Sequence, residues 1–151
     1  ASTSLKNSGS DALQNGTVTY LENSWQSMGT TDANGEVFKE LLPVGYTFRM
    51  TYLDGNSDVW KNAATGGKVS FLTVNVTVKL LDNTSGSPIQ DGTVTYLRNS
   101  SFWQGVGTTD ANGTVTKELL STEYTFRMSY SGSDTFIWKD VTVSPAITFR
   151  R

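Results

Sequence analysis

The sequence has no histidine, no cysteine and only three prolines among its 151 residues. Without histidine and cysteine, the chain cannot build Ser-His-Asp or Cys-His nucleophile systems, the common structural zinc sites or disulfide bonds. No stretch approaches the roughly 20 apolar residues of a membrane-spanning helix, so we expect no membrane insertion. The net charge of −2 provides no basic surface, so we expect no nucleic-acid partner.

The sequence instead contains two copies of one module. The heptapeptide GTTDANG occurs at residues 29–35 and again at residues 107–113, 78 positions later. Two further segments repeat at the same spacing, namely KELL at 39–42 and 117–120, and YTFRM at 46–50 and 124–128. We therefore predict two domains, residues 1–73 and residues 74–151, with no flexible tether between them. A direct connection of this kind predicts a stiff rod.

Polar and apolar residues alternate along several segments of both copies. Val76, Val78 and Leu80 fall on one face of such a segment, and residues 46–52 and 124–130 show the same period of two. Alternation with one apolar face is typical of antiparallel sheets that pack on one side. These segments recur at short intervals between turns rich in Gly, Asn and Asp. We predict an all-β fold of two tandem antiparallel β-sandwiches, with about seven strands in each.

The repeated DANG sequence has the composition of a tight hairpin turn. Asp and Asn side chains accept hydrogen bonds from nearby backbone N–H groups, and Gly adopts a positive φ without strain. The predicted structural turns consist of Asp32, Asn34 and Gly35 in the first copy, and of Asp110, Asn112 and Gly113 in the second. The same turn is needed twice because the same hairpin is built twice.

The second copy resembles a known family of domains. It reads VTVKLLD, then SGSPIQDG, then TTDANG and LLSTEYTF, and the first copy supplies LPVGY at residues 42–46. These motifs resemble the prealbumin-like, Cna-B-type repeats and the carboxypeptidase-regulatory-like domains of bacterial surface and secreted proteins. The resemblance implies Ig-like, Greek-key β-sandwiches that act as stalk, spacer or adhesive modules outside the cell or on its surface.

Some members of this family carry an isopeptide bond between a Lys on the first strand and an Asn or Asp on the last. Lys79 lies on the first predicted strand of the second copy, but residues 144–151 contain neither Asn nor Asp. We therefore expect no such bond in this chain.

The first copy departs from the family pattern at its start. Its first strand has to come from residues 1–5, ASTSL, which show almost no apolar alternation. We expect a weak, frayed strand here. The alternative is that another chain completes the sheet, for example with the C-terminal strand of residues 146–151, which would build head-to-tail fibres.

Trp25, Phe102 and Trp103 are candidate contact residues because they lie where the second copy carries two extra residues. An insertion is tolerated in a surface loop, where exposed aromatic rings could stack on sugars. The alternative is that one ring folds back over the sheet as a lid. Trp60 and Trp138 occupy equivalent strand positions, for which we predict a core or interface role.

We predict no catalytic residues, no metal centre and no cofactor. Asp54, Asn56 and Asp58 form an oxygen-rich cluster that leaves a weak Ca²⁺ site open. Glu40 and Glu118 are repeat-equivalent, and we expect them to face solvent beside lysines instead of forming the carboxylate pair of a glycosidase.

These features favour a non-enzymatic, extracellular or cell-surface module. It would build a stalk, spacer or fibre together with other repeats of the same protein or with neighbouring subunits. One alternative is a carbohydrate-binding module of a secreted polysaccharide-degrading enzyme, with polysaccharide as the partner. Another is a subunit that polymerises head-to-tail by strand exchange.

Overall fold

A computed structural model describes residues 1–151 and confirms that the chain is all-β. It contains thirteen strands, β1 to β13, and no α-helix; the single helical turn is the 3-10 segment η1 (Ala63–Thr65). The chain folds into two compact units, which we name unit 1 (Ala1–Thr73) and unit 2 (Val74–Arg151).

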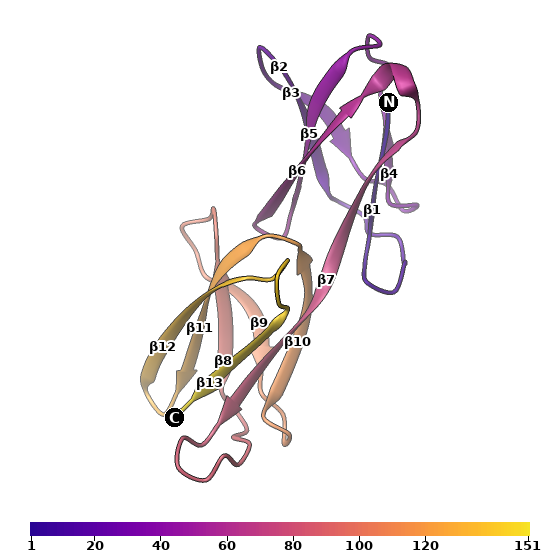
Figure 1. The fold of residues 1–151 in the computed structure, drawn as a ribbon. Helices are drawn as coiled ribbons and strands as arrows, with labels where there is room; N and C mark the ends of the chain where they lie inside the picture. Colours follow the sequence, from indigo (N-terminus) through magenta and orange to yellow (C-terminus); the bar gives the residue numbers. More distant parts are fainter. The chain divides into compact units, whose positions relative to one another are not determined.

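Unit 1 contains two sheets. One has the order β3-β2-β5-β6, and its strands are β2 (Thr17–Glu22), β3 (Ser24–Thr30), β5 (Gly45–Tyr52) and β6 (Gly55–Asn62). In the other, β1 (Ser2–Lys6) lies between β4 (Glu36–Phe38) and the first part of β7 (Lys68–Leu81), as Figure 1 shows. Both sheets contribute to the core, as in a β-sandwich; its members are Leu5, Val18, Tyr20, Met28, Tyr46, Phe48, Met50, Val69 and Phe71.

Unit 2 has the same two-sheet arrangement. One sheet has the order β12-β11-β8-β9, and its strands are β8 (Thr93–Leu97), β9 (Gln104–Thr108), β11 (Glu123–Tyr130) and β12 (Ser133–Asp140). The other contains the last part of β7, with β10 (Thr114–Leu120) and β13 (Ala146–Arg150) as its neighbours. Its core again draws on both sheets, with Val76, Val78, Leu80, Ile147 and Phe149 on one side, and Val94, Tyr96, Tyr124, Phe126 and Met128 on the other.

The fourteen-residue strand β7 belongs to both units. Its buried side chains occupy odd-numbered positions up to Thr73 and even-numbered positions from Val76 onward. Because side chains of a strand alternate between its two faces, this change marks the place where β7 leaves one core and enters the next. The predicted number of about seven strands per half holds only when β7 is counted in both units.

The first and last strands of each unit are parallel neighbours. In unit 1, β1 pairs with β7 from Ser2, opposite Lys68, to Lys6, opposite Leu72. In unit 2, β7 pairs in the same way with β13, beginning at Thr77. The chain therefore enters each unit at one end of this ladder and leaves at the other.

The expectation that the first strand of unit 1 is frayed or supplied by another chain is wrong. Residues Ser2–Lys6 form β1, in which Thr3, Ser4 and Leu5 are all buried. The strand holds its place because it pairs on both edges, with β4 and with β7, so backbone hydrogen bonding compensates for its polar sequence. The Thr3 hydroxyl also lies 3.6 Å from the Met28 sulfur.

The DANG segments form tight turns closed by an aspartate. The Asp32 carboxylate accepts hydrogen bonds from the backbone N–H groups of Asn34 (2.8 Å) and Glu36 (3.1 Å). The equivalent bonds of unit 2 run to Asp110 from the N–H groups of Asn112 and Thr114. In unit 2 the bond from the Thr114 N–H is the main cause that lowers the pKa of Asp110 below its ordinary value of 3.8.

The glycine of each turn docks the hairpin onto the first strand of its unit. The Gly35 carbonyl accepts a hydrogen bond from the Leu5 N–H, and the Gly113 carbonyl accepts one from the Leu80 N–H, both at 2.8 Å. Both glycines have a positive φ, and a Cβ atom at Gly35 would lie only 2.6 Å from the Leu5 carbonyl oxygen. Only glycine permits this approach without strain.

The second threonine of GTTDANG fixes the turn that precedes β2 or β8. The Thr31 hydroxyl is buried, donates to the Leu13 carbonyl (2.9 Å) and accepts from the Gly16 N–H (2.8 Å). Thr109 makes the same two bonds, with Ile89 and Gly92. Most of the repeated heptapeptide is thus accounted for by hydrogen bonds that hold the scaffold.

We expect Thr31→Val to destabilise unit 1 by about 1–3 kcal/mol, because the isosteric side chain leaves the Leu13 carbonyl and the Gly16 N–H without their buried partner. Thr30→Val is the matched control, since Thr30 is exposed, and should change stability by less than about 0.5 kcal/mol. Urea unfolding of both variants provides the measurement. Equal free energies of unfolding would contradict this role for the hydroxyl.

Candidate functional site

Trp25, Arg49 and Asp58 form a stacked cluster on the outer face of unit 1. Trp25 lies on strand β3, and the Arg49 guanidinium carbon is 4.2 Å from its ring centroid. Asp58, the cross-strand partner of Arg49, accepts two hydrogen bonds from that guanidinium at 2.8 and 2.9 Å. The hydrogen bond to Asp58 is the main cause that raises the pKa of Arg49. This bidentate geometry fixes the guanidinium beneath the indole.

Unit 2 builds a related cluster with a different partner. The Arg127 guanidinium carbon lies 4.5 Å from the centroid of the Trp103 ring, and its Nε donates to the Thr95 hydroxyl at 3.1 Å. Phe136 takes the place of the aspartate, and its ring centroid is 5.9 Å from that of Trp103 at an interplanar angle of 43°. Trp103 is therefore half-buried and folds over the sheet, as the alternative interpretation of this ring expected.

The other predicted aromatic positions differ in exposure. Phe102 is 76% exposed and contacts no other ring, while Trp25 is 38% exposed above its arginine. A core role for Trp60 and Trp138 is wrong, because both side chains are more than 60% exposed. Trp60 lies on β6 and Trp138 on β12, and the alternation of side chains along each strand places the indole on the solvent-facing side. Glycan contact by Trp25, Phe102 and Trp103 stays a prediction.

Two carboxylates of the oxygen-rich cluster, Asp54 and Asp58, have different structural roles. Asp58 is held by Arg49, as described above, and Asp54 forms the turn between β5 and β6 with a φ of 65°. The structure brings no group of three or more acidic side chains together. A weak Ca²⁺ site at Asp54, Asn56 and Asp58 stays a prediction.

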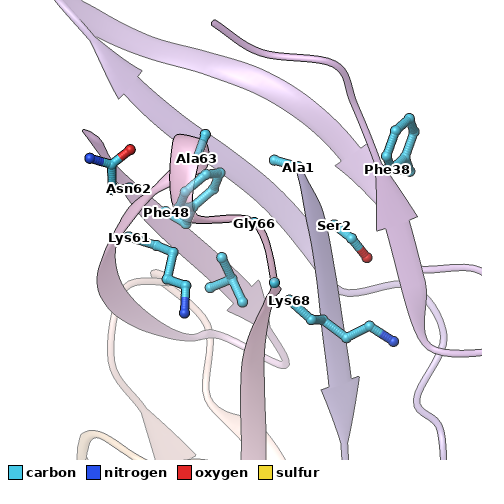
Figure 2. A pocket seen from close by; sticks show the side chains of 11 residues that line it. Ala1, Ser2, Phe38, Phe48, Lys61, Asn62, Ala63, Gly66 and Lys68 are labelled. Atoms are coloured by element: carbon cyan, nitrogen blue, oxygen red, sulfur yellow. The ribbon is translucent and has the colours of Figure 1, made fainter. Parts of the chain in front are cut away.

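A pocket with a volume of about 360 Å³ lies within unit 1, at the end of its sandwich. Figure 2 shows Ser2, Phe38 and Phe48 around it, from strands β1, β4 and β5. Lys61 and Lys68 also line it; the Lys68 ammonium pairs with Glu36, whereas Lys61 has no partner. The walls are apolar and the rim is cationic.

A difference between the two copies explains this pocket. Ala63 lines it in unit 1, whereas the equivalent residue of unit 2, Val141, is 1% exposed and belongs to the core. Leu119 is also a core residue of unit 2, but its equivalent Leu41 is only half-buried. Unit 2 thus fills with its own side chains a space that unit 1 leaves open. The Ala63/Val141 difference is visible when the two copies are aligned, but the sequence alone does not show that these residues lie at a pocket in one unit and in the core of the other.

The pocket offers shape and apolar surface instead of reactive groups. Its titratable side chains are the two lysines, and no carboxylate or hydroxyl nucleophile with a neighbouring base lines it. Such a site suits an apolar side chain, with the lysines at its rim.

Comparisons with family models and with curated proteins found no match for this sequence. Among solved structures, the Bacillus anthracis TIE protein shows 13% identity and a TM-score of 0.41, over 99% of this chain and 32% of that one. A streptococcal ancillary pilin shows 15% identity and a TM-score of 0.35, over 99% and 60%. The shaft pilin SpaA from Lactobacillus rhamnosus GG shows 13% and 0.36, over 99% and 95%. The chain therefore spans about a third of the first of these proteins and three fifths of the second. This degree of similarity assigns neither a family nor a function.

The structure contains no helix that is both long and apolar enough to cross a membrane.

We expect Val141→Ala to destabilise unit 2 by about 2 kcal/mol, because it opens in that unit the space that is already open in unit 1. The reciprocal change, Ala63→Val, should be neutral or stabilise unit 1 by up to about 1 kcal/mol, since the added methyl groups enter an existing pocket. Urea unfolding of both variants compares the two values. A loss of more than about 1 kcal/mol in Ala63→Val would show that the pocket has no room for them.

Proposed function

We propose that the chain is a non-enzymatic structural module, made of two prealbumin-like, Greek-key sandwiches that share β7 and carry tension in an extracellular stalk, spacer or fibre. Its partners would be further repeats of the same protein or neighbouring subunits. The observation that carries this proposal is the parallel pairing of the first and last strands in each unit. The resemblance of the sequence to surface-protein repeats agrees with it.

The parallel pairing decides how the unit responds to force. In unit 1 the chain enters beside Ser2 and leaves beyond Leu72, at the opposite end of the same ladder. Tension between these points slides β1 along β7, so the hydrogen bonds of the ladder are loaded together. A hairpin pulled from one end would instead lose its bonds one at a time, each with a net contribution of about 1 kcal/mol. The observed topology therefore suits a module that resists stretching.

The direction of pulling provides a test of this role. The chain has no cysteine, so introduced pairs give unique attachment points. We expect unit 1 pulled through Ala1→Cys and Leu72→Cys to rupture at several times the force needed through Lys6→Cys and Leu72→Cys, because Lys6 and Leu72 are opposite each other at one end of the ladder. Single-molecule force spectroscopy measures both.

Equal rupture forces in the two pulling geometries would contradict a tension-bearing role. Unfolding in urea should be similar for the two cysteine pairs, since the side chains of Lys6 and Leu72 are exposed and Ala1 lies at the pocket. That measurement separates a mechanical effect from a loss of stability.

Glycan binding through Trp25, Phe102 and Trp103 remains an alternative prediction, and the arrangement of the rings does not favour it. Trp103 is stacked on Arg127 and tilted against Phe136. We therefore expect the protein not to be retained on insoluble polysaccharide, and Trp103→Ala to change nothing. Retention that is lost in Trp103→Ala would reverse this ranking.

A further inference from the structure

The two units differ most where the strand after the DANG turn continues. In unit 2 this strand, β10, runs to Leu120, whereas in unit 1 the equivalent strand, β4, ends at Phe38. The four residues that follow Phe38 are KELL at 39–42, the same letters that end β10. The difference therefore does not come from the sequence of this segment.

Leu42 is nevertheless anchored as in unit 2. The Tyr46 hydroxyl donates to the Leu42 carbonyl at 3.2 Å, and the Tyr124 hydroxyl donates to the Leu120 carbonyl at 3.0 Å. The backbone is thus held at the same corner in both units, but the Leu42 side chain is 71% exposed. The missing element is a partner strand, not the position of the segment.

The ladder between β1 and this segment is intact up to the point where β1 begins. The Ala1 nitrogen donates to the Lys39 carbonyl at 2.6 Å, and the Lys39 N–H donates to the Ala1 carbonyl at 2.9 Å. Glu40 and Leu41, the next residues along, make no backbone hydrogen bond. Because Ala1 and Lys39 exchange both bonds, the next residue whose N–H and C=O face a strand that continues β1 upstream is Leu41, whereas the backbone groups of Glu40 point away from it.

Unit 2 shows what such a continuation does. Leu80 and Leu5 are equivalent, because each donates to the glycine carbonyl of its DANG turn, so Val76 corresponds to Ala1. β7 extends upstream of Val76, and Val74 packs against the unit 2 core. The equivalent of Val74 in unit 1 would be a residue two positions before Ala1, beside the pocket that Ala1 and Phe48 line in Figure 2.

We propose that this pocket and the unpaired backbone of Leu41 form a docking site for an extended apolar segment that continues β1 upstream. The segment pairs antiparallel to residues 39–42 and inserts one apolar side chain into the pocket. The apolar walls select that side chain, and no charge on the segment is needed. The inference rests on the proposed function, since it makes unit 1 the acceptor of a preceding strand, as unit 2 accepts β7.

The test adds the equivalent piece of β7 to the whole chain. One variant carries Leu-Thr-Val-Asn, the sequence of residues 72–75, directly before Ala1; the matched control carries Leu-Thr-Asp-Asn. We expect the valine form to slow amide hydrogen exchange at Leu41 by tenfold or more, and to raise the melting temperature of unit 1 by about 4–8 °C. The aspartate form should stay near the unextended chain, and the Leu119 amide provides the internal reference.

Unchanged exchange at Leu41 in the valine form would overturn the inference, and so would equal protection in the two forms, because the pocket would then contribute nothing. Either result leaves the proposed function intact if pulling through residues 1 and 72 still gives the higher rupture force. A low rupture force together with protection of Leu41 would instead remove the mechanical role and leave the docking site.

Discussion

The organisation of this protein depends on β7 serving as the last strand of unit 1 and the first strand of unit 2. Burial changes here from odd to even positions between Thr73 and Val76, so the chain moves from one core to the next without a linker. In each unit the first and last strands lie in one sheet as a parallel pair.

The sequence predicted the strands with regular alternation, such as β5, β7 and β11, and the turns that are held by local hydrogen bonds. Asp32 and Gly35 build their turn with residues at most four positions away, so the composition of DANG was sufficient to identify it. The role of Thr31 was not visible, because its partners lie in the preceding loop, 15 and 18 residues upstream. The polar strand β1 was also misjudged. Its burial depends on pairing with β4 and β7, which no local pattern of Ser2–Lys6 reveals.

The aromatic residues show the same limit in another form. We predicted a core or interface role for Trp60 from its strand position, which Trp138 repeats. Trp60 nevertheless shares a face of β6 with Asp58 and Asn56, and the alternation of side chains along the strand places all three outward. This alternation along β6 was visible in the sequence. The stacking of Arg49 and Arg127 on Trp25 and Trp103 could not be predicted, because it depends on the register between neighbouring strands, such as β3, β2 and β5 in unit 1.

The identical KELL segments show why duplicated sequence does not ensure duplicated structure. The same four residues end a strand in unit 2 and form none in unit 1. In both units, however, a tyrosine hydroxyl donates to the carbonyl of the last leucine, Leu42 or Leu120. A strand requires a neighbour, since its backbone groups are satisfied only in pairs. In unit 2 that neighbour is the upstream length of β7, and the side chain of Val74 and the larger Val141 complete the core around it. Unit 1 has the acceptor backbone, the smaller Ala63 and an open pocket in the corresponding place. Identical KELL segments therefore meet different neighbours in the two units, and the Ala63/Val141 difference lies at the place where those neighbours differ.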